Sequence, residues 1–180
     1  MKLLLDTCVL YPTVMREMLL GAARQGHFEP LWSARILEEW ARAARKIGPT
    51  GEAQARAEIA LICGAWPNAS VPPVAGVEAR LWLPDPADIH VLAAAVAGHA
   101  DAIVTVNNKD FPRHTLAEEE LDRIGPDQLL YDFWLKDPDG LAEVAGRVLD
   151  EANRLSDGGW DMRPLLKKAR LPRLAKALAA

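Results

Sequence analysis

The stretch DPADIHVLAAAVAGHADAIVTVNNKDFP, residues 85–112, decides the fold that we predict for this chain. It opens with acidic residues, continues as a helix of small and apolar residues, turns, and then forms a short apolar strand. The strand leads into Asn107, Asn108 and Asp110. One helix–strand unit therefore carries carboxylates at both ends, an arrangement that suits an acidic pocket for a divalent metal ion.

The first half of the chain alternates between predicted strands and helices. The expected elements, in chain order, are a strand over 2–6, a helix over 13–26, a strand over 28–32, and helices over 33–47 and 52–65. Together with the 85–112 unit, this alternation is typical of an α/β fold with a mostly parallel sheet. After Pro112 the alternation stops, and residues 116–180 look helical. We therefore predict a helical extension that packs on the core.

Polar side chains follow two of the predicted strands. Asp6 comes directly after Leu3, Leu4 and Leu5, and Asp110 follows the strand predicted over 102–106. Sites in parallel sheets form beyond the carboxyl ends of the strands, so we expect these groups at one edge. For Asp6 the alternative role is to cap the turn into the next helix.

The acidic start of the 85–112 helix has two explanations. Asp85 followed by Pro86 is a good helix-start signal, and capping alone explains Asp85. Asp88 shares a helix face with Val91 and Leu92, because successive helical residues turn by about 100°. A carboxylate on an inward face is unfavourable unless it is paired or bound to a cation, so we predict a functional role for Asp88.

Other candidates support the same pocket. Glu39 flanks the apolar stripe of its helix and can reach past the core edge, whereas Glu38 lies nearly opposite that stripe. The alternative for both is a solvated surface pair. Thr7 either hydrogen-bonds to Asp6 or satisfies the turn. Thr105, in an otherwise apolar strand, either orients a carboxylate or reflects strand propensity.

Converging carboxylates need positive charge between them. Two like charges 4 Å apart repel by about 4 kcal/mol at an effective dielectric constant near 20. A site with oxygen ligands only favours Mg²⁺ or Mn²⁺ over zinc. These ions retain waters and bind substrate phosphates, and phosphodiester hydrolysis uses both properties. Asn107 and Asp110 have the alternative of being ordinary turn formers.

Composition and charge indicate the size of the core, the possible partners and the cellular compartment of the protein. Half of the 180 residues are hydrophobic, which allows a sizeable core, and the net charge is −4. Residues 161–180 carry six basic side chains and one acid, so this tail either contacts nucleic acid or an acidic partner, or forms a solvated helix face. Cys8 and Cys63 form no metal-binding motif and indicate a reducing compartment. The apolar run at the N-terminus is too short for a membrane segment, so we expect a cytoplasmic protein without a membrane partner.

Three blocks of this sequence resemble the PIN-domain family, in particular VapC-like toxin ribonucleases. They are LLLDTCVLYP at 3–12, ILEEWARA at 36–43, and the 85–112 stretch, in this order. The third block is the most specific, because its acidic pair, Ala-rich helix, V-T-x-N segment and D-F-P segment occur together. The resemblance covers about the first 130 residues. It implies a three-layer α/β/α sandwich around a central parallel sheet, with a nuclease domain over 1–130 and a C-terminal helical extension over 131–180.

The resemblance also implies an activity. It points to an endoribonuclease that depends on Mg²⁺ or Mn²⁺ and to the toxin of a VapBC-type pair, with RNA as substrate, a cognate antitoxin and a homodimeric state. The catalytic, metal-binding acids implied by it are Asp6, Glu39, Asp88 and Asp110. Asn107 lies beside them where the family often has an acid, and Thr105 matches the threonine of the motif.

Other functions stay open at this point. A non-catalytic module would use its acidic edge to bind metal structurally or to bind a basic partner. A PIN nuclease with a processing role would keep the chemistry without the toxicity. RNA needs positive charge near the acidic pocket, for which Lys109 and Arg113 are candidates. His90 lies opposite the face of Val91 and Leu92, which predicts a surface position. The six tryptophans are scattered, which is typical of core or interface residues.

Overall fold

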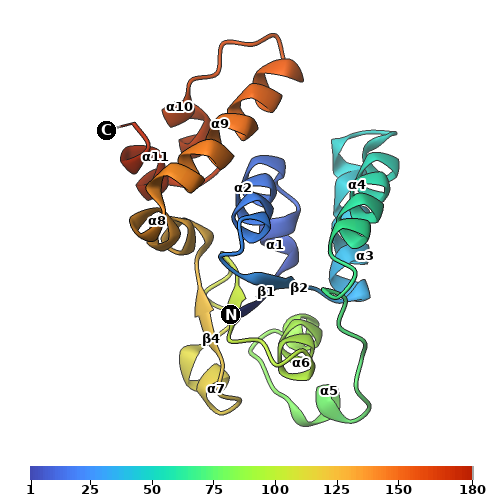
Figure 1. The fold of residues 1–180 in the computed structure, drawn as a ribbon. Coiled ribbons are helices and arrows are strands. Elements are labelled where there is room, and N and C mark those ends of the chain that lie inside the picture. Colours follow the sequence, from blue (N-terminus) through green and yellow to red (C-terminus); the bar gives the residue numbers. More distant parts are fainter. Residues whose placement is uncertain (180) are drawn as a thin grey trace. The chain divides into compact units, whose positions relative to one another are not determined.

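The computed structural model describes residues 1–179, which fall into two compact units (Figure 1). The first unit comprises Met1–Tyr11 and Glu29–Arg123. The second comprises Pro12–Phe28 and the residues from Ile124 onward. Each unit has its own internal packing and is described by itself.

A four-stranded sheet lies at the centre of the first unit. Its order is β2 (Glu29–Leu31), β1 (Lys2–Leu5), β3 (Ala102–Val104) and β4 (Asp122–Ile124). Strand β1 runs parallel to both of its neighbours, with Leu4 opposite Leu31 on one side and Ile103 on the other. This arrangement confirms the predicted α/β fold with a parallel sheet.

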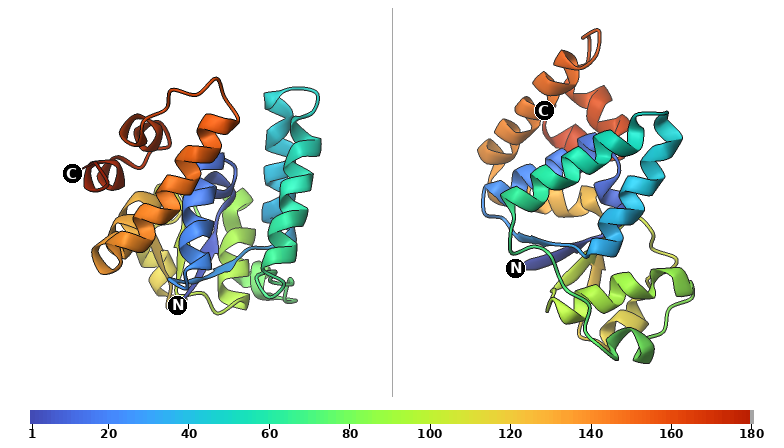
Figure 2. Two further views of the ribbon diagram at one scale, coloured as in Figure 1. Left: turned by 45° about the horizontal axis from the view of Figure 1, so that its top comes forward. Right: turned by 90° about the vertical axis from the view of Figure 1, so that its right-hand side faces the viewer.

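Helices cover both faces of this sheet. Helix α6 (Ile89–Ala97) packs on β1 and β3. Helices α1 (Thr7–Leu10), α3 (Ala34–Ala43) and α4 (Gly51–Ala65) lie on the other side of the sheet (Figures 1 and 2). Leu3, Leu4 and Leu5 are almost completely buried between the layers, because an apolar strand in a parallel sheet must be covered on both faces. The first unit is thus the predicted α/β/α sandwich.

Helix α3 begins where the sequence predicts it. The Ser33 hydroxyl accepts a hydrogen bond of 3.2 Å from the backbone N–H of Ile36, which satisfies one of the free donors at the start of the helix. Ile36 and Trp40 are buried on its apolar stripe. A 3₁₀ turn, η1 (Ala44–Ile47), ends this segment, and the remaining short elements of the unit are α5 (Val77–Arg80), η2 (Pro86–Asp88) and α7 (Arg113–Ala117).

The prediction that residues 116–180 are entirely helical is wrong at β4. Its three residues are Asp122, Arg123 and Ile124, and they form the edge of the sheet beside β3. Two charged residues out of three give no apolar alternation, so periodicity could not indicate a strand. An edge strand needs only one neighbour, and charged side chains are common there.

The second unit consists of helices. Its elements are α2 (Thr13–Arg24), α8 (Pro126–Lys136), α9 (Pro138–Arg154), α10 (Met162–Lys168) and α11 (Pro172–Ala177). Helix α9 packs against α2 and α8, and α11 packs against α8 and α10. Asp127 accepts hydrogen bonds from the backbone N–H groups of Arg173 and Leu174 and so holds the start of α11. The predicted division of the chain into 1–130 and 131–180 stays a prediction. Within residues 1–179, no helix combines the length and the apolar character needed to cross a membrane.

Gly21 allows α2 and α9 to approach closely, and this contact is testable. A Cβ atom at Gly21 would lie 2.3 Å from Cγ1 of Val144. Replacing a helical glycine by alanine normally stabilises a helix by about 1 kcal/mol. We expect Gly21→Ala instead to lower the free energy of unfolding by roughly 1–3 kcal/mol, because Val144 has little freedom to move away. Urea unfolding measures the change, and the same substitution made in a Val144→Ala background should lose most of its effect. A stabilised Gly21→Ala protein would show that the two helices are not in this contact.

Candidate metal centre

Asp6 lies at the carboxyl end of β1 and is held by two donors. Only 7% of the residue is exposed. The buried Thr105 hydroxyl donates a 2.8 Å hydrogen bond to Oδ2, and the Cys8 thiol donates to the same oxygen at 3.0 Å. The Asp6 side chain makes no capping bond to α1, so the capping role considered for it is wrong. Both donors bind Oδ2, which leaves Oδ1 uncommitted to either of them.

Cys8 acts as a donor at this site. Burial, followed by the charge of Asp6, raises the pKa of the Cys8 thiol to about 12. The thiol therefore stays protonated at neutral pH and donates its proton to Asp6, whereas a metal ligand would have to be a thiolate. Sequence reasoning considered Cys8 only for disulfides and metal motifs. Its position two residues after Asp6, in the first turn of α1, was the available signal.

Three carboxylates converge beside the start of α6. Oxygens of Asp85, Asp88 and Asp110 lie within 4.8 Å of one another. Asp85 caps η2 by accepting a 2.9 Å hydrogen bond from the backbone N–H of Ala87, and Asp88 occupies the N-cap position of α6. Asp110 follows β3 in a loop that the fully buried Phe111 anchors. Asp85 therefore combines the capping role predicted for it with a place in the cluster.

Asn107 links this cluster to Asp6. Its side-chain amide donates a 3.2 Å hydrogen bond to Oδ2 of Asp88. Its backbone N–H donates at 3.0 Å to the hydroxyl of Thr105, which in turn donates to Asp6. One threonine hydroxyl thus fixes both the Asp6 carboxylate and the loop that carries Asn107.

The negative charge of the site acts most clearly on Asp88. Its pKa is raised to about 6, first by desolvation and then by the charges of Asp6, Asp85, Asp110 and Glu39. Asp6 and Glu39 lie outside the three-carboxylate cluster, yet their charges act on the same side chain. These causes all oppose the charged form of Asp88, so the field at this carboxylate is strongly negative. A proton or a bound cation would relieve it.

Glu39 projects from α3 and is held by neighbours from other elements. The Thr7 hydroxyl donates a 3.1 Å hydrogen bond to Oε2, and Nε2 of His90 lies 2.8 Å from Oε1. Arg35, one turn earlier on α3, lies 3.7 Å from the same oxygen. The hydrogen bond considered between Thr7 and Asp6 is thus wrong, because the hydroxyl is directed to Glu39. Glu38 instead joins exposed ion pairs with Arg42 and Arg56.

His90 is buried, which corrects the predicted surface position. Only 5% of the residue is exposed. Helical periodicity placed it away from Val91 and Leu92, but Glu39 and Arg35 of α3 approach that second face of α6. Burial lowers the pKa of His90, while the charge of Glu39 acts in the opposite direction. Contact between two helices from distant parts of the chain is invisible to the pattern within one of them.

Of the two basic side chains predicted to contact RNA, one is paired and one is free within the part of the chain that the structure describes. Arg113 forms an ion pair with Asp122 and donates to the backbone carbonyl of Arg123. Lys109, in the loop between Asn107 and Asp110, is exposed and has no ion-pair partner among residues 1–179. Lys109 is therefore the basic side chain of this loop that is free to meet a phosphate.

The ligand atoms that this site offers fit a hard cation. Asp85, Asp88 and Asp110 bring carboxylate oxygens together, the Cys8 thiol is protonated, and the neighbouring acids oppose a negative charge on Asp88. Comparison with protein-family profiles matches residues 2–109 to the PIN domain, which is more than half of the chain. The chain belongs to the PIN-domain family. PIN domains are generally nucleases and usually use divalent metals, in agreement with the acidic cluster. The match includes Asp6, Glu39 and Asp88; comparisons with curated proteins and with solved structures found no match.

The raised pKa of Asp88 in this PIN domain predicts how its stability depends on pH without metal. Between about pH 4, the ordinary aspartate value, and pH 6, the folded state holds a proton that the unfolded chain has lost. Stability therefore falls as pH rises through this range and stays lower above it. Asp88→Asn removes this loss and keeps an acceptor for Asn107. After allowance for solvent screening, we expect about 1 kcal/mol of stabilisation at pH 7.5, or roughly 2–4 °C in Tm.

Thermal unfolding in a chelator at pH 4 and pH 7.5 checks this expectation. The gain from Asp88→Asn should be present at pH 7.5 and absent at pH 4. Glu38→Gln is the matched control, because Glu38 sits among arginines that lower its pKa to about 2. That variant should gain no stability at pH 7.5. An equal gain for Asp88→Asn at both pH values would contradict the account of its titration.

Proposed function

We propose that this PIN domain is a metal-dependent endoribonuclease that hydrolyses RNA phosphodiester bonds. The observation that carries the proposal is the convergence of Asp85, Asp88 and Asp110, together with the raised pKa that Asp6 and Glu39 help to impose on Asp88. A surface that merely binds a basic partner does not need buried donors to orient its acids. Here Thr105 and Thr7 orient Asp6 and Glu39, as pre-organised metal ligands require.

Some residues of the site would hold the metal, and others orient the residues that hold it. Asp6, Glu39, Asp88 and Asp110 would hold Mg²⁺ or Mn²⁺, and Asp85 forms the carboxylate cluster together with Asp88 and Asp110. When bound, such a cation supplies Lewis acidity toward a phosphodiester and a source of hydroxide near neutral pH. Thr105 and Cys8 keep Asp6 oriented, Asn107 holds Asp88, and Thr7 and His90 hold Glu39. In-line attack by water would leave 5′-phosphate and 3′-hydroxyl ends.

Oxygen-only ligands set the metal preference. Carboxylates without thiolate or neutral imidazole suit Mg²⁺ and Mn²⁺, which bind few protein ligands and retain sites for substrate phosphate. His90 contacts Glu39 and is placed to support that ligand, which is a common role for a buried polar group beside a metal site.

The cellular role is a further step within this proposal. The VapBC-type toxin role, a cognate antitoxin, a homodimer and a cytoplasmic location rest on the resemblance of residues 3–12, 36–43 and 85–112 and on composition. Growth arrest on expression, relieved by a small protein encoded beside this one, would support the toxin role. Cleavage activity without growth arrest would favour a processing nuclease.

Cleavage assays with matched variants test the enzyme. With Mn²⁺, we expect the wild-type protein to cut single-stranded RNA, and Asp6→Asn or Glu39→Gln to lower the rate by about 100-fold or more, since each removes a charged ligand. Glu38→Gln changes the neighbouring acid of α3 in the same way and should leave the rate within about twofold. Sequencing of the product ends checks the 5′-phosphate. Equal rates for Glu39→Gln and Glu38→Gln would remove Glu39 from the site.

Metal binding is measurable without catalysis. Mn²⁺ should raise the Tm of the wild-type protein, because a ligand that binds only the folded state stabilises it. The rise should be larger at pH 7.5 than at pH 5, where Asp88, with its pKa of about 6, is mostly protonated. Asp88→Asn should abolish most of the rise, and Glu38→Gln should keep it. A rise in Tm without RNA cleavage would identify a non-catalytic metal-binding module.

A further inference from the structure

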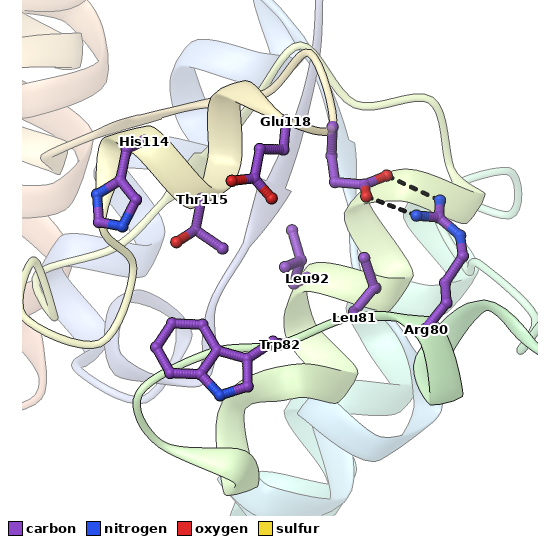
Figure 3. Close-up of a pocket in the computed structure, with 8 residues that line it drawn as sticks. Arg80, Leu81, Trp82, Leu92, His114, Thr115 and Glu118 are labelled. Atoms are coloured by element: carbon purple, nitrogen blue, oxygen red, sulfur yellow. Dashed lines mark hydrogen bonds and ion pairs between the residues drawn. The ribbon is translucent and has the colours of Figure 1, made fainter.

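The first unit contains a pocket that is lined by segments adjacent in sequence to those of the acidic cluster. A pocket with a cavity volume of about 190 Å³ lies between Leu81 and Trp82 on one side and α7 on the other (Figure 3). Leu92 of α6 also lines it, and the ion pair of Arg80 with Glu119 lies at one side. The volume is below the range of about 300–1,000 Å³ typical for drug-sized ligands, so it suits a small ligand with one ring or two fused rings.

Trp82 supplies an aromatic surface that the fold itself does not use. It is 62% exposed, whereas Trp32 and Trp40 are buried in the core. Exposure of an indole loses the favourable burial of a large apolar side chain, and a stacked ligand would restore part of it. Trp82 is therefore not a core residue of this chain, and the prediction that the tryptophans are mostly core or interface residues stays untested for it. In Figure 3 its ring lies across the pocket from His114 and Thr115.

Thr115 presents an unsatisfied hydroxyl to the same pocket. The residue is 7% exposed and lines the cavity opposite Trp82. Its side chain has no hydrogen-bond partner among residues 1–179. The hydroxyl is open to the pocket, so a polar ligand edge that met Thr115 would find a hydrogen-bonding group that none of the described residues occupies.

A carboxylate at the pocket that is unpaired within residues 1–179 favours a ligand with N–H groups. Glu119 is bound to Arg80 through hydrogen bonds of 2.5 and 2.7 Å, which lower the pKa of that carboxyl. Glu118 is exposed at the pocket and has no ion-pair partner in the part of the chain from 1 to 179. Its free carboxylate can only accept hydrogen bonds. The pocket thus offers an aromatic face, an apolar floor and acceptors at the edge.

We propose that this pocket is a nucleobase subsite of the nuclease, which binds an unpaired base next to the cleaved phosphate and prefers guanine. This inference rests on the proposed function. The segments that carry the acids also carry the pocket: Trp82 comes three residues before Asp85, Leu92 lies one turn after Asp88, and His114 comes four residues after Asp110. A strand whose phosphate lies at the acids would place a neighbouring base beside Trp82.

Guanine matches the acceptors best. Proteins read single-stranded RNA by stacking unpaired bases on aromatic side chains and by hydrogen-bonding to their Watson–Crick edges. Guanine carries N1–H and N2–H donors side by side, which a carboxylate can accept together, as Glu118 would. Thr115, as donor or acceptor, can meet a further polar atom of the base. Uracil, with a single ring N–H between two carbonyl oxygens, would meet repulsion from the carboxylate.

Binding of a nucleoside tests the subsite without any cleavage. Each tryptophan gives one indole N–H signal in a ¹H–¹⁵N spectrum, and Trp82→Phe identifies the signal of Trp82 by its loss. Addition of guanosine should move the Trp82 signal, and uridine at equal concentration should move it less. Thr115→Val and Glu118→Gln should weaken the guanosine effect by about 3- to 10-fold in Kd. Leu61→Ala, which trims another exposed apolar residue, should leave it unchanged.

RNA cleavage is the second arm of the test of the subsite. Trp82→Ala should raise KM for single-stranded RNA by about 10-fold or more, with a smaller effect on kcat, because base stacking contributes mainly to binding. Trp82→Phe keeps an aromatic face and should stay within about threefold of wild type. Glu118→Gln should flatten the guanine preference at the bases flanking the cut, as read by sequencing the products.

The two arms separate failure of the subsite from failure of the nuclease. A protein that cuts RNA while guanosine leaves the Trp82 signal unmoved overturns the subsite and leaves the nuclease standing. A protein that cuts no RNA but binds guanosine at Trp82 overturns the nuclease and retains a base-binding pocket. If argininamide moves the Trp82 signal and guanosine does not, the pocket receives a guanidinium group of a partner protein and the inference is wrong.

Discussion

Repulsion among carboxylates gathered at the carboxyl ends of β1 and β3 is the constraint on which the rest of this site depends. Asp88 shows it directly, since desolvation and four neighbouring acids together raise its pKa to about 6. Acids so placed would normally move apart into water. They stay because donors such as Thr105 hold them in place. Repulsion of this kind lowers the stability of the metal-free protein, and a bound cation would relieve it.

The frame that imposes this constraint is the parallel sheet. Leu3, Leu4 and Leu5 are buried on both faces of β1, so Asp6 emerges at a point that cannot shift without exposing the strand. Helix α6 packs on β1 and β3 and brings Asp88 to the same edge. Rigid elements thus position the acids, while the loops after them carry the exposed groups, Lys109 and Trp82, that are available to a substrate.

Much of the fold and the convergence of Asp88 with Asp110 were predictable, because each signal lies within one short segment. The apolar run of β1, the Ser33 cap and the apolar stripe of α3 each indicate an element without reference to the rest of the chain. Local periodicity also separated Glu39 from Glu38, since only Glu39 lies beside the buried stripe. The same reasoning failed for His90, whose burial comes from α3, and for β4, whose strand form comes from its pairing partner.

The sequence by itself determined the α/β class and the alternation of strands and helices in the first half of the chain, because periodicity is a property of neighbours along the chain. The set of metal-binding acids stays a prediction. Only the tertiary structure decided that Thr105 and Cys8 bind Asp6, that Thr7 binds Glu39, and that an unpartnered Thr115 faces Trp82. Some of these pairs join segments that are distant in sequence, and others depend on the conformation of a turn. Their distances depend on how sheet and helices pack, which no local pattern records.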